Sequence, residues 1–423
     1  MGLVERDLAV IWHPYTQMKT ALPPIPIVRG EGAYLFAEDG TRYIDAVSSW
    51  WTNIHGHAHP HIAKKVAEQL LKLEHVIFAG FTHPTAVELA ERLLSILPDN
   101  QEKVFYSDNG STAVEVAMKM CLQYWHNTGQ NRTKILAFKN AYHGDTFGAM
   151  AVSGRSAFTA AFDSLLFEVE FIDLPIEANI SALKSQISAL KSQLACFIFE
   201  PLVQGSAGML MYEPKYLNEL MAHCRVEGIL TIDDEVFTGF GRTGKPFACN
   251  HVSESPDIMC FSKGLTGGTM ALGVTTCTQQ IFNAFLSDDK LKTLFHGHSF
   301  TANPVACSSA LASMDLFLEE ATEKNIERIS EQHAAFAERI KNHPKLKSVR
   351  QTGTIIAMEW DTGASTSYFS NLRDRLYKYF LAAGIILRPL GNVLYILPPY
   401  CISNGDLHYI YGKIEQALVE IGE

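Results

Sequence analysis

Two short apolar runs constrain the fold most, because each is followed by a charged residue and by a loop that contains glycine. Residues 229–232 precede Asp234, and residues 258–261 precede Lys263. Most lysines are solvated, so a surface position is the default interpretation of Lys263. Here, however, two successive strand-like runs are each followed by a charged residue and a loop with glycine, and this pattern predicts two neighbouring strands. Their ends bring the aspartate and the lysine to one edge of a sheet.

The rest of the pattern predicts an α/β fold with two domains. Further strands are expected at residues 103–106, 135–138, 195–199 and 273–277, with helical patterns between them, such as 85–97 and 111–121. This alternation predicts a large domain, residues 61–310, around a mostly parallel sheet. Residues 1–60, with a hairpin around Glu38-Asp39-Gly40, are expected to form a smaller α+β domain together with residues 311–423.

A buried lysine and a buried aspartate at adjoining strand ends suit the cofactor pyridoxal phosphate. The lysine can form a Schiff base with the cofactor, and the aspartate can keep the pyridine nitrogen protonated, so that the ring accepts electrons. In the loop 107–112, Gly110 permits close backbone approach and Ser111 lies at the start of an expected helix. Such a loop is either an ordinary helix cap or a phosphate site; beside Lys263 and Asp234 we favour phosphate.

Two other loops carry candidate residues. Tyr142 follows the strand expected at 135–138, where an aromatic ring can stack on a flat heterocycle or simply fill the core. The polar loop 296–304 contains Gly297, His298 and Ser299 and opens a further helix. Its hydrogen-bond donors are candidates for a second set of phosphate contacts.

Composition argues against several kinds of function. A net charge of −10 and a pI of about 5.9 are unfavourable for binding nucleic acid or anionic membranes. We expect no membrane-spanning segment and no signal peptide. The eight cysteines are scattered, as is typical of reduced thiols in a cytoplasmic protein. His55, His57, His59 and His61 alternate, but Gly56 and Pro60 predict a turn, so we expect no metal site there.

Over nearly its whole length the chain resembles the class III aminotransferases, a family of fold-type I pyridoxal-phosphate enzymes. Residues 234–244 and the Lys263 loop carry the motifs of the whole class. More diagnostic runs are Ile-Trp-His-Pro-Tyr-Thr-Gln-Met at 11–18, Ser-Ser-Trp-Trp at 48–51, Tyr-His-Gly-Asp-Thr-Phe-Gly-Ala-Met at 142–150, Arg-Pro-Leu-Gly at 388–391 and Leu-Pro-Pro-Tyr at 397–400. The resemblance implies a homodimer with its active sites at the subunit interface.

The resemblance also implies a role for each matching residue. The implied catalytic residues are Lys263, Asp234 and Tyr15, with Lys263 moving the proton. The implied cofactor-binding residues are Gly110, Ser111, Tyr142, Asp234, Lys263 and, toward the other subunit, His298 and Ser299. The implied substrate-binding residues are Tyr15, Trp50, Trp51, Tyr142, Gly297 and Arg388.

Two of these positions need comment. Arg388 is expected to clamp the distal carboxylate of a substrate, since a planar two-pronged donor suits that group. The family more often has Pro-Thr where this chain has His298-Ser299, although Ser299 keeps the hydroxyl. Without the resemblance, the two tryptophans would be interpreted as core packing.

The implied reaction is transamination of 8-amino-7-oxononanoate to 7,8-diaminononanoate in biotin biosynthesis. S-Adenosylmethionine is the implied amino donor, with lysine as the alternative. Another ω-aminotransferase, acting on ornithine, 4-aminobutyrate or a polyamine, is the nearest rival, because fold does not fix substrate. A pyridoxal-phosphate-binding DNA regulator is disfavoured, since no basic helix-turn-helix segment precedes residue 30.

Overall fold

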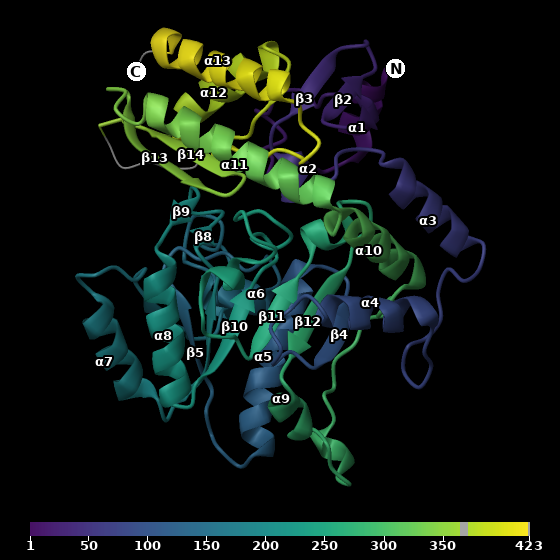
Figure 1. The fold of residues 1–423 in the computed structure, drawn as a ribbon, viewed down its shortest axis with the longest axis vertical. Coiled ribbons are helices and arrows are strands. Elements are labelled where there is room, and N and C mark those ends of the chain that lie inside the picture. Colours follow the sequence, from purple (N-terminus) through teal and green to yellow (C-terminus); the bar gives the residue numbers. More distant parts are fainter. Residues whose placement is uncertain (364–370, 422–423) are drawn as a thin grey trace.

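The computed structural model describes residues 1–363 and 371–421, and a seven-stranded sheet forms its centre (Figure 1). In spatial order the strands are β4 (Lys103–Ser107), β12 (Gly273–Cys277), β11 (Ile258–Phe261), β10 (Leu230–Asp234), β7 (Leu194–Phe199), β5 (Lys134–Phe138) and β6 (Glu170–Ile172). Strands β11, β10, β7, β5 and β6 run parallel, and β12 is antiparallel to both of its neighbours. The mostly parallel sheet expected from the sequence is confirmed, whereas its edge strand β6 was not expected.

The central strands are buried on both faces. Every residue of β7, β10, β11 and β12 is buried, and the parallel strands β7 and β11 read as continuous apolar runs. The helices around the sheet are α3 (Pro60–Leu70), α4 (Pro84–Leu94), α5 (Gly110–Asn127), α6 (Phe147–Ala151), α7 (Ile180–Leu190), α8 (Pro214–Val226), α9 (Gln279–Asn283) and α10 (Pro304–Phe317). A two-stranded ribbon, β8 (Val203–Gln204) with β9 (Leu210–Met211), lies above the sheet.

Helix α5 shows how the sequence positions the site. Strand β4 ends at Ser107, and the Asn109 side chain then accepts a hydrogen bond from the Thr112 amide at 2.9 Å, which caps the helix. The buried face of α5 packs under β10, β11 and β12. The first turn of α5 is therefore fixed at the same sheet edge as the ends of β10 and β11.

The two ends of the chain lie together above the sheet (Figure 1). The N-terminal part contributes α1 (Leu3–Val10), β1 (Ile27–Glu31), β2 (Tyr34–Ala37), β3 (Arg42–Asp45) and α2 (Ser48–Trp51). The C-terminal part contributes α11 (Glu320–Ile340), β13 (Leu346–Thr352), β14 (Ile355–Trp360), α12 (Asn371–Ala382), β15 (Ile385–Ile386), β16 (Val393–Ile396) and α13 (Asn404–Glu420).

One sheet joins these two ends. The expected hairpin is confirmed as β2 and β3, and Gly40 takes a positive φ of 87° in its turn. Strand β15 adds to β3 in parallel, with Ile385 opposite Ile44. This pairing sets the loops that follow β3 and β15 side by side. The domain limits at residues 60 and 310 stay a prediction.

None of the described helices combines the length and the apolar character that a bilayer crossing requires. All eight cysteines are free, and seven of them, including Cys196, Cys260 and Cys277, are buried. The four alternating histidines run from a turn into the start of α3, and three of them have different hydrogen-bond partners. His57 contacts Asp45, His61 contacts Asp315, and His55 contacts Ser313.

Candidate active site

Lys263 and Asp234 line one cavity of about 500 Å³ at the carboxyl edge of the sheet. Asp234 is the last residue of β10 and lies opposite Cys260 of β11, and Lys263 follows three residues later. The structure thus brings together the two residues that the strand ends singled out. Lys263 has a φ of 41°, a left-handed conformation that is costly for a residue with a side chain and that often marks functional sites.

The Lys263 amine lies in an aromatic and acidic environment. Its Nζ is 4.6 Å from the centre of the Trp51 ring and 5.6 Å from that of Phe237. The side chain keeps some exposure to the cavity, but protein surrounds it on most sides. This burial lowers the pKa of Lys263 to about 8, against the opposing effect of the carboxylates of Asp234 and Glu200. An appreciable fraction of the amine is therefore neutral near pH 7.5.

A histidine fixes the Asp234 carboxylate. His143 donates from Nδ1 to Asp234 Oδ2 across 2.6 Å, and the Val236 amide donates to Oδ1 at 3.1 Å. His143 is 4% exposed, and its Nε2 has no hydrogen-bond partner among the described residues. Sequence reasoning quoted His143 within a motif but gave it no role.

Glu200 is a second acid at a strand end that sequence reasoning missed. It follows β7, lines the same cavity, and accepts hydrogen bonds from the Tyr142 and Gly205 amides, each at 2.9 Å. Burial raises the pKa of Glu200 to about 7. The available signal was an acid directly after a fully apolar strand.

The start of α5 supplies an anion site on the cavity wall. The amides of Gly110 and Ser111 have no acceptor among the described residues, and the N-terminus of a long helix favours negative charge. A Cβ at Gly110 would lie 2.6 Å from Val236 Cγ1, so only glycine lets this turn approach so closely. The Ser111 hydroxyl is 2.8 Å from that of Thr146, which in turn donates to Glu115.

The expected substrate residues form a wall near this cavity. Trp51 lines it directly, and the Arg388 guanidinium lies 4.7 Å from the centre of the neighbouring Trp50 ring. Tyr15 packs edge-on against Trp50 at 5.6 Å and donates its hydroxyl proton to Asp145. Arg388 follows β15 and the tryptophans follow β3, so the pairing of these strands assembles the wall.

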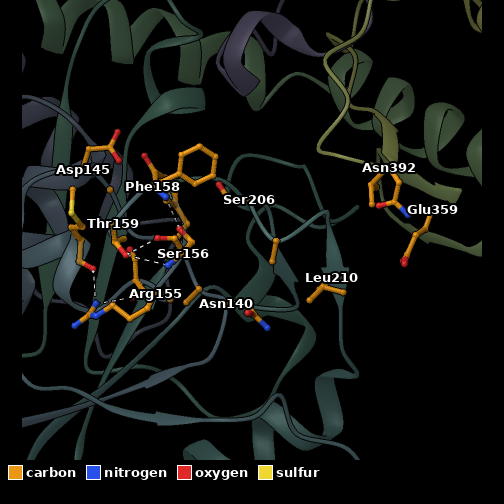
Figure 2. Close-up of a pocket in the computed structure, with 18 of the residues that line it drawn as sticks. Asn140, Asp145, Arg155, Ser156, Phe158, Thr159, Ser206, Leu210, Glu359 and Asn392 are labelled. Atoms are coloured by element: carbon orange, nitrogen blue, oxygen red, sulfur yellow. Dashed lines mark hydrogen bonds between the residues drawn. The ribbon is translucent and has the colours of Figure 1, made fainter. Parts of the chain in front are cut away.

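A second cavity of about 400 Å³ adjoins the first and shares Tyr142, Gly144 and Asp145 with it. Figure 2 shows Asp145, Phe158 and Thr159 on one side of this cavity and Glu359 and Asn392 on the other. It therefore lies between loops above the sheet and the strands β14 and β16.

Three expected residues lie elsewhere in the same chain. Gly297, His298 and Ser299 line neither cavity. His298 Nε2 is 3.1 Å from His296 Nε2, and its Nδ1 is 3.9 Å from Asp108. The expected contact of His298 and Ser299 with the phosphate of a second subunit, and the expected substrate contact of Gly297, stay predictions.

The residues of the larger cavity fit pyridoxal phosphate. The Lys263 amine suits the aldehyde of that molecule, and the Asp234 carboxylate, held by a buried histidine, suits its pyridine nitrogen. The start of α5, with its two free amides, suits the phosphate. The parallel sheet and this set of groups define a fold-type I pyridoxal-phosphate enzyme.

Comparison with known proteins identifies the family. The model of the class III aminotransferases matches residues 15–418, and the chain belongs to this family. It is 47% identical to the adenosylmethionine-8-amino-7-oxononanoate aminotransferase of Synechococcus elongatus, over 97% of this chain and 99% of the relative. It is 35% identical to the Staphylococcus aureus protein of the same name, over 99% and 98%.

Solved structures agree with this assignment. The adenosylmethionine-8-amino-7-oxononanoate aminotransferase of Methanocaldococcus jannaschii superposes with a TM-score of 0.95 at 36% identity, covering 100% of this chain and 99% of that one. An omega transaminase from Pseudomonas jessenii in complex with PMP superposes with a TM-score of 0.93 at 26% identity, covering 99% and 98%.

Proposed function

We propose that this chain transfers the amino group of S-adenosylmethionine to 8-amino-7-oxononanoate, which gives 7,8-diaminononanoate for biotin biosynthesis. The observation that carries the proposal is the wall of Tyr15, Trp50 and Arg388 beside the Lys263–Asp234 cavity. Trp50 adjoins Trp51 in the chain, Tyr15 donates to Asp145, and both Trp51 and Asp145 line that cavity. The relatives of the same name, 35–47% identical over nearly the whole chain, support it.

The cofactor supplies the aldehyde that joins to amines and the ring that takes up electrons. We propose that the amides of Gly110 and Ser111 bind its phosphate and that Asp234 binds its pyridine nitrogen. His143 keeps the Asp234 carboxylate in one orientation. The Tyr142 side chain lines both cavities, so it is placed to pack near the cofactor ring and to touch substrate.

The Lys263 amine moves the proton. With a pKa of about 8, its neutral form is available to take a proton from the reacting carbon of the donor. In the first half of the cycle Lys263 would pass this proton from the donor carbon to the cofactor, and in the second half it would move a proton from the cofactor to the acceptor carbon. The rings of Trp51 and Phe237 beside Nζ exclude water from this step.

Substrate selection falls to the aromatic wall. Arg388 offers two parallel N–H groups to the distal carboxylate of 8-amino-7-oxononanoate. Tyr15 and Trp50 present apolar surface to its aliphatic chain, and aromatic faces also attract a sulfonium such as that of S-adenosylmethionine. We count Tyr15 with Lys263 and Asp234 as catalytic because its hydroxyl faces Asp145 at the rim of the cofactor cavity.

We also propose a homodimer in the cytoplasm. Gly297, His298 and Ser299 lie outside the cavities of their own chain, beside the exposed rings of Phe295 and Phe300. In a dimer this loop can reach the partner's phosphate site. Mixing Lys263→Ala with Ser299→Ala tests this arrangement: hybrid dimers regain one intact site, so activity should exceed that of either variant alone.

A half-reaction tests the proposed function. S-Adenosylmethionine added alone to the cofactor-loaded enzyme should bleach the visible absorption band of the cofactor, and 8-amino-7-oxononanoate should restore it. A response to lysine instead would change the donor only. A response to ornithine or 4-aminobutyrate, with none to 8-amino-7-oxononanoate, would overturn the substrate assignment and favour a different ω-aminotransferase.

A further inference from the structure

Glu115 is a half-buried acid that lies one helical turn after Ser111, on the same side of α5. Its hydrogen-bond partners among the described residues all lie at the start of α6. Its Oε1 accepts from the Thr146 hydroxyl at 2.6 Å, from the Gly148 amide at 2.8 Å and from the Ala149 amide at 3.0 Å. A carboxylate so near an anion site weakens anion binding through its charge, so its position calls for another explanation.

The hydroxyl groups between Glu115 and the proposed phosphate site form a chain with one direction. Thr146 donates its only hydroxyl proton to Glu115, so the 2.8 Å hydrogen bond between the hydroxyls of Thr146 and Ser111 uses the Ser111 proton. The Thr146 amide donates back to Ser111 Oγ at 3.1 Å. Glu115 thus orients Thr146, and Thr146 fixes the Ser111 side chain by two hydrogen bonds.

The loop that carries Thr146 also packs closely on α5. A Cβ at Gly148 would overlap Glu115 Oε2, and a Cβ at Gly144 would overlap the Ser111 hydroxyl. Hydrogen bonds and packing therefore join the loop 144–149 to α5 at the same two points, Ser111 and Glu115. The wall of the phosphate site next to Ser111 depends on how this loop is held.

We propose that Glu115 is a positioning residue, whose Oε1 holds Thr146 and thereby sets Ser111 and the loop 144–149 around the cofactor phosphate. The proposal rests on the proposed function in one respect, namely that the start of α5 binds that phosphate. Thr146 and Ser111 line the cavity and Glu115 does not, so Glu115 acts through these two residues.

A ligand without the phosphate isolates this role. Pyridoxal has the ring and the aldehyde of the cofactor, so the ratio of its Kd to that of pyridoxal phosphate measures the phosphate site alone. Fluorescence titration of the cofactor-free protein gives both Kd values without turnover. We expect Glu115→Ala to lower this ratio about tenfold or more and to change the Kd of pyridoxal less than about threefold. An equal loss for both ligands would indicate a general structural role and would overturn the proposal.

Two conservative variants separate the acceptor from the charge. Glu115→Gln keeps an acceptor oxygen at the same reach without the charge, and Glu115→Asp keeps the charge on a side chain one methylene shorter. We expect the glutamine variant to keep the Kd ratio within about threefold of the wild type and the aspartate variant to lose it as alanine does. The opposite order would overturn the proposal. If Glu115→Ala does not fold, this pair decides alone.

An exposed glutamate on another helix supplies the matched control. Glu91→Ala, on α4, should leave both Kd values unchanged. The wild type separates the two proposals. If it binds pyridoxal as tightly as pyridoxal phosphate, the assignment of the phosphate to the start of α5 fails. If it prefers pyridoxal phosphate and Glu115→Ala keeps that preference in full, only the role of Glu115 fails.

Discussion

His143 and Asp234 share a hydrogen bond of 2.6 Å between Nδ1 and Oδ2, at a place where both side chains are almost closed to solvent. The two residues are 91 positions apart in the chain. His143 makes no other side-chain contact of this kind among the described residues, so its effect passes through the Asp234 carboxylate.

Replacing His143 should therefore weaken cofactor binding. His143→Leu leaves one carboxylate oxygen without its donor, and we expect the Kd for pyridoxal phosphate to rise about tenfold or more. His143→Asn is the matched control, because its amide N–H can take the place of Nδ1–H. Fluorescence titration of the cofactor-free protein measures both. Equal binding by the leucine variant and the wild type would show that Asp234 needs no orienting partner.

The close contact between Gly110 and Val236 predicts that a second substitution can restore cofactor affinity lost by a first. A Cβ at Gly110 would lie 2.6 Å from Val236 Cγ1, so Gly110→Ala should displace the first turn of α5 and lower cofactor affinity. Val236→Ala removes that carbon, so the double variant should recover much of the affinity. An additive loss in the double variant would mean that the clash lies elsewhere.

Covalent capture of the cofactor should depend on pH. Capture needs the neutral Lys263 amine, whose pKa burial lowers to about 8. The association rate of pyridoxal phosphate with cofactor-free enzyme should therefore rise with pH through about 8 and then level off. Stopped-flow absorbance measures this rate, with Lys263→Ala as the control that binds without capture. A rate still rising toward pH 10 would mean that the amine is less shielded than the structure indicates.

Arg388 should discriminate by charge at the far end of the substrate. The wild-type enzyme should prefer 8-amino-7-oxononanoate to its methyl ester, and Arg388→Met should lose most of that preference, by about tenfold or more in kcat/KM. Arg388→Lys should keep part of it, because a lysine supplies charge without the planar fork. An undiminished preference in Arg388→Met would remove Arg388 from the site.

Asp233 should make stability depend on pH. It is buried on β10, neither of its oxygens has a partner among the described residues, and burial raises its pKa well above the usual range. Glu235, close by, is also buried with a raised pKa. The folded protein thus holds a proton that the unfolded chain releases above about pH 4. The stability due to Asp233 is greatest below that pH and is lost as pH rises toward the folded pKa.

Asp233→Asn should remove that loss. We expect the thermal midpoint of the variant, relative to the wild type, to increase between pH 5 and pH 9. The exposed Asp288→Asn should show no such trend. A constant difference across this range would mean that the pKa of Asp233 is not raised in the folded protein.

Much of the sheet could be predicted because buried parallel strands carry a continuous apolar signal. That signal located β10 and β11, and it predicted that Asp234 and Lys263 lie at one edge of the sheet. The three-residue β6 is too short to give such a signal, and apolar runs do not reveal that β12 runs antiparallel.

The partners of the reactive residues could not be predicted, since they are set by tertiary contact. Nothing near His143 in the sequence indicates Asp234, and Arg242 reaches Trp51 across 191 positions. Glu200 was predictable in principle, because it follows the apolar β7 directly. His298 and Ser299 were assigned to the phosphate site of a second chain, and the fold of one chain does not test that assignment.

Because β3 pairs with β15, the residues assigned to the substrate and those assigned to the cofactor come from different parts of the chain. The groups assigned to the cofactor come from the middle of the chain, while Tyr15, Trp50 and Arg388 come from its two ends. Mutation of the ends can therefore alter which amine is accepted without disturbing the strand ends that hold Lys263 and Asp234. New substrate preferences in such a scaffold can evolve, or be engineered, by exchanging the segments around residues 10–51 and 385–400 as a set.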